Sequence, residues 1–200
     1  METEIMKNNV TEFSKSEAVR DSIFKFTTDF LDNKPLNIGE VGCARSEIGR
    51  ATDGWSTFFW ADYVYKNGGS LKVCDIEKEA INFVNETIPE KYKVESFYMS
   101  GTDFLKEKQP FDFIYLDGSN DPDETRKQFY LIEETTRVIL VDDWDTKGFI
   151  RSQEQQEEFE EAGFIFCNMQ HTYGCMGLII RQSDKDRMEE LINEIENEGD

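Results

Sequence analysis

The sequence predicts an α/β protein with a mostly parallel central sheet that helices cover on both faces. Short apolar segments that stop at acidic residues have the pattern of buried parallel strands whose carboxyl ends carry polar groups. Helical patterns separate these segments, and repeated strand–helix alternation builds a parallel sheet. The four acid-tipped segments are Pro35–Gly42, Ser70–Asp75, Phe111–Asp117 and Arg137–Asp143. Because open α/β sheets bind ligands at the carboxyl edge of their strands, we expect a ligand site there.

Helix and strand alternate through the first half of the chain. Val19, Ile23, Phe26 and Phe30 recur at helical spacing, which predicts an amphipathic lead helix at about residues 16–31. The elements expected next are a strand over 35–42, a helix from 54 to about 65, a strand over 70–75, a helix over 77–87 and a strand over 94–99.

The second half continues the alternation and then closes it. The expected elements are a short helix over 102–106, a strand over 111–117, a helix over 123–135, a strand over 138–141 and a charged helix ending near residue 163. Two strands, 164–169 and 175–180, joined by a tight turn predict an antiparallel hairpin. A final helix carries an apolar stripe of Met188, Leu191, Ile192 and Ile195 before an acidic tail.

The chain is expected to form one domain. Its 200 residues include 16 Phe, 7 Tyr and 3 Trp, enough for a substantial core. We find no repeat, low-complexity region or linker. The predicted domain spans 1–200, with a helical lead (1–34), a core (35–181) and a C-terminal helix with the acidic tail (182–200).

Charge and cysteine usage exclude several classes of protein. The formal net charge is −20, from 42 acids against 22 bases, so the chain repels nucleic-acid phosphate and carries a solvated acidic surface. No apolar run approaches the about 20 residues that cross a bilayer, and the N-terminus lacks a signal-peptide pattern. The 4 cysteines form no CxxC pair and are expected to be reduced. We therefore expect a cytoplasmic protein without nucleic-acid or membrane partners.

The first acid-tipped strands predict a ligand with a positive centre and a ribose. Gly39–Gly42 followed by Gly54 is neither a GxGxxG fingerprint nor a P-loop. Glu40 suits an ammonium or sulfonium, and Asp75 is placed to accept the hydroxyls of a ribose. The alternative for each acid alone is an ordinary helix cap. Ser56 or Thr57 is expected to cap the second helix.

With these residues the chain resembles the Rossmann-like, class I S-adenosylmethionine-dependent methyltransferases. The matching pieces are Glu40–Gly42, Gly54–Thr57, Val73–Ile76, Glu79–Ile81, Phe111–Gly118 and Val138–Trp144, in the family's order and spacing. The resemblance implies a doubly wound, mostly parallel seven-stranded sheet with a C-terminal antiparallel hairpin. It also implies S-adenosylmethionine as cofactor.

The resemblance assigns roles around that cofactor. Glu40 and Gly42 would flank the methionine portion, and Asp75 would hold the ribose. Gly101, Thr102 and Asp103 would lie beside the adenine. Ser56 and Thr57 would lie where their helix approaches the cofactor, with Asp117 also in contact. Arg45 is a candidate partner for the cofactor's carboxylate, with plain surface solvation as the alternative.

Asp117, Asp142 and Asp143 resemble the metal site of cation-dependent O-methyltransferases, such as the catechol and macrocin-type sugar enzymes. Mg²⁺ prefers oxygen ligands, and three carboxylates from neighbouring strand ends can converge on it. A bound cation lowers the pKa of a substrate hydroxyl. The alternative is that Asp142 and Asp143 cap a loop while Asp145 faces water.

The chain departs from this family at the general base. Catechol enzymes carry a Lys directly after the acid of the fourth strand, where this chain has Gly118. The base is therefore open among Asp121, Asp123 and His171. His171, the only histidine, is expected in the turn after the sixth strand, at the same sheet edge as the acids, and its near-neutral pKa suits proton removal. Asp117 and His171 are the predicted catalytic residues, with simple exposure the alternative for the histidine.

Two further groups invite functional interpretations that packing explains better. Cys167, His171 and Cys175 have no known zinc-finger spacing, so buried thiols are favoured over zinc. The aromatic residues between Trp55 and Tyr63 recur at helical spacing and should mostly face the core. Trp144, beside the acids, is a candidate for stacking on a substrate ring, with plain packing as the alternative.

The sequence thus predicts an S-adenosylmethionine-dependent methyltransferase that acts on a small-molecule or sugar hydroxyl with a divalent cation, Mg²⁺ first. The alternatives are a non-catalytic methyltransferase-like binding or regulatory protein and, less favoured, a nicotinamide-dependent oxidoreductase. Little inserted material lies over the active edge. The acceptor site is therefore either open or completed by the lead helix or by another subunit of a homo-oligomer.

Overall fold

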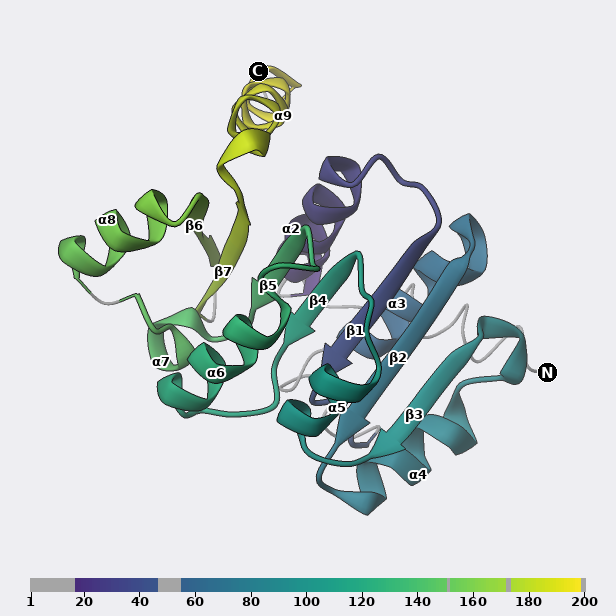
Figure 1. Cartoon of the computed structure of the whole chain (residues 1–200). Coiled ribbons are helices and arrows are strands. Elements are labelled where there is room, and N and C mark those ends of the chain that lie inside the picture. The colour runs from purple at the N-terminus through teal and green to yellow at the C-terminus, as the bar shows by residue number, and fades with distance from the viewer. Residues whose placement is uncertain (1–16, 47–54, 151, 172–173, 199–200) are drawn as a thin grey trace.

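The computed structural model describes residues 17–46, 55–150, 152–171 and 174–198 and shows a seven-stranded sheet between helices (Figure 1). The strands are β1 (Leu36–Val41), β2 (Gly69–Asp75), β3 (Val94–Tyr98), β4 (Phe113–Leu116), β5 (Val138–Val141), β6 (Phe164–His171) and β7 (Gly174–Arg181). The helices are α2 (Glu17–Phe30), α3 (Ser56–Asn67), α4 (Lys78–Thr87), α5 (Gly101–Glu107), α6 (Pro122–Ile132), α7 (Trp144–Lys147), α8 (Gln153–Glu161) and α9 (Lys185–Glu198), with short 3-10 turns η2 (Glu90–Tyr92) and η3 (Gln182–Asp184).

The strand order is β3-β2-β1-β4-β5-β7-β6, and it confirms the predicted fold class. β1 to β5 pair in parallel, whereas β7 runs antiparallel to both β5 and β6. The chain leaves β1 toward β2 and β3 and later returns to place β4 on the other side of β1. This reversal is a topological switch point, where open α/β sheets form a crevice at the carboxyl ends of their strands.

The core lies on both faces of the sheet. Successive side chains of a strand point to opposite faces, so in β4 Phe113 and Tyr115 join one buried cluster and Ile114 and Leu116 join the other. The first cluster includes Trp60 of α3, and the second is built around aromatic side chains from α5, α6, α8 and the adjoining loops. Every residue of β4 and β5 is buried, as expected for central parallel strands.

The aromatic residues of α3 confirm the expectation that most of them face the core. Trp60 is fully buried, and Phe58 and Tyr63 are nearly so. The prediction that Ser56 or Thr57 caps this helix is wrong. Trp55 occupies the N-cap position without a side-chain cap, and Ser56 and Thr57 are the first residues of the helix. Their hydroxyls instead serve buried groups of the first strand and its loop, described below.

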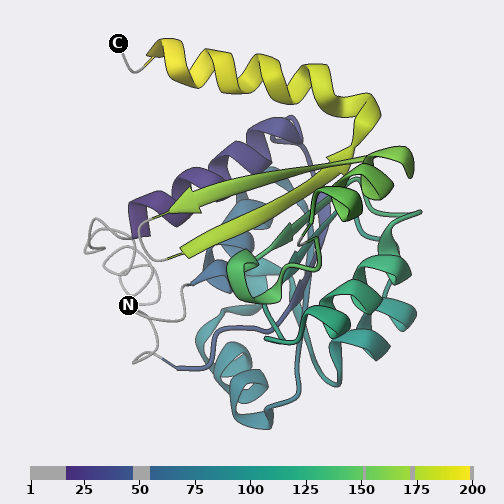
Figure 2. The ribbon, with the colours of Figure 1, turned by 90° about the vertical axis from the view of Figure 1, so that its left-hand side faces the viewer.

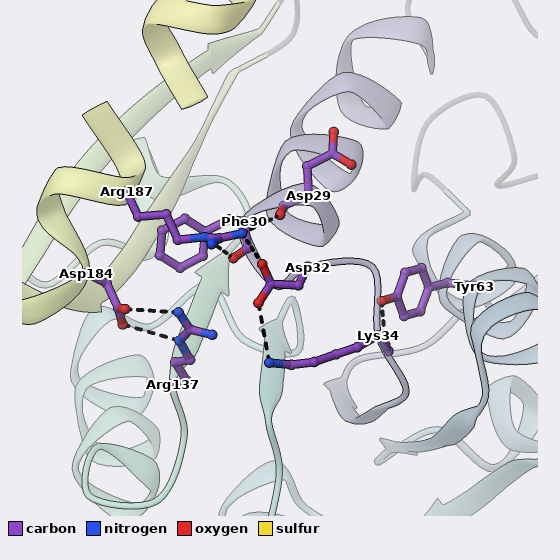
Figure 3. Close-up of polar contacts among 8 residues, drawn as sticks. All are labelled: Asp29, Phe30, Asp32, Lys34, Tyr63, Arg137, Asp184 and Arg187. Carbon is purple, nitrogen blue, oxygen red and sulfur yellow. Dashed lines mark hydrogen bonds and ion pairs between the residues drawn. The ribbon is translucent and has the colours of Figure 1, made fainter. Parts of the chain in front are cut away.

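The C-terminal helix α9 lies across the end of the molecule beside α2 (Figure 2). Arg187 of α9 donates hydrogen bonds to the main-chain oxygens of Phe30 (2.8 Å) and Asp29 (3.2 Å) and pairs with the Asp32 carboxylate (Figure 3). A second pair, Arg137 with Asp184 at 2.9 Å, holds the approach to α9. Helix C-termini leave carbonyls without intrahelical partners, so Arg187 acts as a remote C-cap for α2.

No helix in the described part of the chain combines the length and apolar character that crossing a membrane requires.

Arg187→Ala should lower the free energy of unfolding by about 1–2 kcal/mol, because the carbonyls at the end of α2 lose their charged donor. Urea denaturation measures the loss, and amide hydrogen exchange should rise in α9. The control is Lys185→Ala, which removes a lysine that pairs with Glu189 on the exposed surface. Equal stability of the two variants would contradict the capping role.

Candidate functional site

A cavity of about 180 Å³ opens at the carboxyl edge of the sheet, beside the switch point. The residues after β1, β2, β3 and β4 form its wall, and α6 closes one side. The lining residues used below are Gly42, Asp75, Ile76, Met99, Ser100, Gly101, Gly118, Ser119, Glu124 and Gln128. The predicted ligand edge of the sheet therefore carries a cavity.

Two glycines let the loops around this cavity approach one another. Gly42 has a φ of 84°, and a Cβ there would lie 2.8 Å from the backbone of Asp117. A Cβ on Gly101 would lie 2.4 Å from a methyl of Val41 and 2.7 Å from the side-chain nitrogen of Gln128. Larger residues at either position would force the wall apart, so both glycines are required by the shape of the cavity.

Glu40 is a fully buried carboxyl beneath the cavity. The Ser56 hydroxyl donates to its Oε1 at 2.5 Å, and Oε2 has no hydrogen-bond partner among the described residues. Burial raises the pKa of Glu40 to about 8, with the nearby Asp117 and Asp75 carboxylates adding to the shift against the Ser56 hydrogen bond. A positive charge brought near this carboxyl would favour its ionised form.

Asp75 lies in the cavity wall and is nearly buried. Its Oδ2 accepts the N–H of Cys43 (3.2 Å), and its Oδ1 accepts the N–H of Glu77 (2.8 Å). The second bond is a local turn to the residue just before α4, and α4 itself has no side-chain cap, so Asp75 does not act as a helix cap. Each carboxylate oxygen has a further acceptor site. Asp75 can therefore anchor two loops and still accept hydroxyls from a ligand.

Asp117, Asp142 and Asp143 converge beside the cavity. One ligand oxygen of each lies within 4.8 Å of the others. Asp117 and Asp142 follow the paired residues Leu116 and Val141 of β4 and β5, so the strand register places them side by side. Asp143 has a φ of 44° and stands at the N-cap position of α7, but its side chain makes no capping hydrogen bond. Asp143 therefore does not cap α7 with its side chain, and Asp145 is exposed, as the loop-cap alternative assumed.

Lys147, the last residue of α7, enters this acid cluster. Its Nζ pairs with the Asp117 carboxylate and lies 3.5 Å from Asp143, and only 3% of its side chain is exposed. Burial alone would lower the pKa of Lys147, but the carboxylates of Asp117, Asp142 and Asp143 outweigh burial and raise it. Lys147 was not among the predicted site residues, because the lysine of the catechol enzymes directly follows the acid of the fourth strand. The four-residue spacing from Asp143 was the available signal.

Ser56 and Thr57 connect the start of α3 to the first strand and its loop. Ser56 binds Glu40 as described, and the Thr57 hydroxyl accepts the N–H of Ala44 at 2.9 Å. Neither residue lines the cavity. Both residues support the loop beneath the cavity from behind and would not contact a ligand in it.

The wall after β3 differs from the expected one. Ser100 and Gly101 line the cavity, whereas Thr102 and Asp103 do not. Thr102 donates to Glu124 at 2.5 Å, and Asp103 accepts the Ser100 hydroxyl at 2.7 Å. Two sets of lining residues were missed: Ile76, which is 67% exposed at the rim, and Glu124 and Gln128 of α6. An apolar residue directly after a strand-end acid was the signal for Ile76.

Two of the three candidate bases, Asp121 and Asp123, have other partners. Asp121 caps α6 by accepting the N–H of Asp123 at 3.0 Å, and Asp123 pairs with Arg126 at 2.7 Å. His171 ends β6, two strands from β5, and its side chain lies outside the described residues. Arg45 is exposed, and the loop that follows, residues 47–54, is also outside the description.

Packing in the core accounts for the two cysteines considered as zinc ligands and for the tryptophan considered for substrate stacking. Cys167 packs against one face of the sheet and Cys175 against the other, so the two thiols do not face a common ion. Trp144 is 4% exposed and stacks on Phe166 with ring centroids 4.4 Å apart. The structure therefore favours the packing alternative for Trp144, because its ring is part of the core.

No protein-family model matches the chain, and a search of curated proteins finds no match. Solved structures do match. Monomeric WbdD has a TM-score of 0.57 at 14% identity over 86% of this chain and 42% of that chain. Another structure of WbdD, a bifunctional kinase-methyltransferase, has a TM-score of 0.56 at 14% identity over 88% of this chain and 46% of that chain.

A third match is the MycE methyltransferase of the mycinamycin biosynthetic pathway, in complex with Mg and SAH. Its TM-score is 0.57 at 14% identity, over 90% of this chain and 54% of that chain. The chain thus spans about half the length of these solved structures. At this identity the likeness shows the fold, which is the Rossmann-like α/β fold of methyltransferases.

Glu40→Gln should stabilise the protein more at about pH 8.5 than at about pH 5. The unfolded carboxyl ionises above its ordinary pKa of 4.5, while the folded one stays protonated up to about 8. Wild-type stability therefore falls as pH rises through this window, by on the order of a few kcal/mol, and the substitution removes that loss. Urea denaturation at both pH values measures the difference.

The matched control for this comparison is Glu95→Gln, at an exposed position of β3. It should change stability little at either pH. A gain from Glu40→Gln of the same size at both pH values would show that Glu40 is ionised in the folded protein.

Proposed function

We propose that the protein is an S-adenosylmethionine-dependent methyltransferase that methylates a hydroxyl of a small molecule, a sugar first, with the help of a divalent cation. One observation carries the proposal: the cavity and the acid cluster share a wall. Asp117 belongs to the cluster, and the next residue, Gly118, lines the cavity. A cofactor in the cavity and an acceptor on the acid cluster would be neighbours.

The cavity suits the parts of the cofactor. Asp75 keeps acceptor capacity for ribose hydroxyls, and the exposed Ile76 and the backbone at Met99–Gly101 offer an apolar slot for a flat base. Glu40 beneath Gly42 gains its charge most easily when a cation is near, which suits the ammonium or sulfonium of S-adenosylmethionine. Thr102 and Asp103 would support this wall from behind.

The acid cluster suits a hard divalent cation in donor type and spacing. Asp117, Asp142 and Asp143 would hold it, and Mg²⁺ is the first candidate because all three donors are carboxylate oxygens. The Mg reported in the MycE structure supports this assignment. Such a cation would polarise an acceptor hydroxyl and lower its pKa.

The remaining work falls to the protein's own residues. S-adenosylmethionine supplies an electrophilic methyl on a sulfonium that departs as a neutral thioether. The site must therefore align the acceptor oxygen behind that methyl and keep water out, which is positioning rather than covalent catalysis. The hydroxyl proton must pass to a base, for which His171 remains our candidate, with Asp117 orienting the acceptor.

The second candidate function is a non-catalytic, methyltransferase-like binding protein. The observation that favours it is Lys147, whose ammonium contacts two acids of the cluster. Turnover of the cofactor with any acceptor would exclude this second function.

Asp75→Asn should weaken binding of S-adenosylmethionine about tenfold, because a charged acceptor for the ribose is lost. Isothermal titration of the purified protein measures the affinity, and circular dichroism confirms that the variant folds. The matched control is Asp186→Asn, which changes an exposed acid of α9 away from the cavity and should stay within about twofold of the wild type. Folded wild-type protein that binds no S-adenosylmethionine would refute the proposed function.

Asp142→Asn should lower cation-stimulated methyl transfer about 10–100-fold, because one of three carboxylates leaves the cluster. The assay follows methyl transfer to a panel of sugars with Mg²⁺ and with EDTA. The matched control is Asp145→Asn, three residues further on and exposed. Wild-type activity that is unchanged in EDTA would remove the cation from the proposal and leave the methyl transfer.

A further inference from the structure

Lys147 is the only buried lysine or arginine among the described residues. We propose that Lys147 is a built-in counter-ion of the acid cluster, which holds the three carboxylates together when no divalent cation is bound and weakens the binding of one. This inference rests on the cation site of the proposed function. It adds a residue that sets the affinity of that site.

The position of Lys147 is fixed by packing. Trp144 opens α7 and stacks on Phe166, and a Cβ on Gly177 or Gly148 would lie 2.4 or 2.5 Å from an atom of Trp144. The helix that begins at Trp144 ends at Lys147, whose backbone N–H bonds the carbonyl of Asp143 at 2.8 Å. The ammonium is thus delivered to the cluster by a short helix anchored in the core.

The charges of the cluster explain why an ammonium is needed. Three carboxylates whose oxygens lie within 4.8 Å of one another repel, and Asp142 is almost completely buried. The ammonium of Lys147 also leaves water, a cost that only close pairing offsets. Its contacts with Asp117 and Asp143 provide that pairing from acids on two different segments. In a simple ion pair one ammonium offsets one carboxylate. Here the ammonium of Lys147 offsets part of the charge of three neighbouring carboxylates.

The same charges predict how a divalent cation would behave. Three carboxylates and one ammonium leave a net charge of −2, which one divalent cation balances. The ammonium and the cation repel each other across a few ångströms, so each lowers the affinity of the cluster for the other. Lys147 therefore keeps the cluster intact without a cation and makes cation binding weak and reversible.

The test is Lys147→Met, which keeps most of the side-chain volume and removes the charge. Titration with Mn²⁺, followed by electron paramagnetic resonance, should show binding about tenfold tighter than in the wild type. In EDTA the variant should melt at a lower temperature than the wild type, and Mn²⁺ should raise its Tm by more. The matched control is Lys66→Met, which removes an exposed lysine paired with Asp62 and should match the wild type in both measurements.

Unchanged or weaker Mn²⁺ binding by Lys147→Met would overturn the proposal. The double variant Lys147→Met with Asp117→Asn should lose the gain, which assigns the tighter binding to the cluster rather than to the acidic surface. If Lys147→Met does not fold in EDTA, the test is whether it refolds with millimolar Mn²⁺. Recovery of native circular dichroism supports the proposal, and failure of both Lys147→Met and Lys147→Gln to recover with Mn²⁺ overturns it.

The proposed function and the role of Lys147 can be refuted independently of each other. Wild-type protein that binds no S-adenosylmethionine refutes the methyltransferase and leaves the Mn²⁺ comparison as it stands. Binding of the cofactor with no effect of Lys147→Met on Mn²⁺ refutes only the role of Lys147.

Discussion

The parallel register of β1, β4 and β5 is the constraint on which the rest of the site depends. The N–H of Asp117 bonds the last residue of β1, and the N–H of Asp142 bonds the last residue of β4, so the acids leave the sheet at adjacent points. Parallel strands that are buried on both faces are mostly apolar along their length, so their charged residues gather near the ends. A shift of one residue between β4 and β5 would bury one carboxylate in the core and disperse the cluster. The cavity and the acid cluster both follow from this alignment.

The sheet and the acid cluster could be predicted because both depend on local patterns. Apolar runs of strand length gave β1, β2, β4 and β5, and the acids that end them necessarily meet at one edge. The packing of Trp144 could not be predicted in this way, and for Lys147 the four-residue spacing indicated a contact with Asp143 but not with Asp117. A helix of four residues is too short to show a periodic pattern in the sequence. Its direction depends on how Trp144 packs against Phe166 and beside Gly148 and Gly177. Long-range packing decided both residues.

The expected roles of Ser56, Thr57, Thr102 and Asp103 show a second kind of limit. Rules for helix starts consider the nearest backbone N–H, and on that basis Ser56 or Thr57 should have been a cap. A buried carboxyl at Glu40 outweighed the rule, since a desolvated Oε1 gains more from a hydroxyl than an exposed helix end does. After β3, Ser100 caps α5 by accepting the N–H of Asp103. Ser100 and Gly101 line the cavity, and the Asp103 side chain does not.

The bond between Arg187 and Phe30 joins residues 157 positions apart in the chain. During synthesis, therefore, α2 is made early but its last carbonyls wait for their donor until residue 187 has left the ribosome. Loop-closure entropy makes such a contact slow to form, so it belongs among the last to be established. We therefore expect the contact between α9 and the end of α2 to form late in folding. A chain that stops before α9 would leave the last carbonyls of α2 without this charged donor.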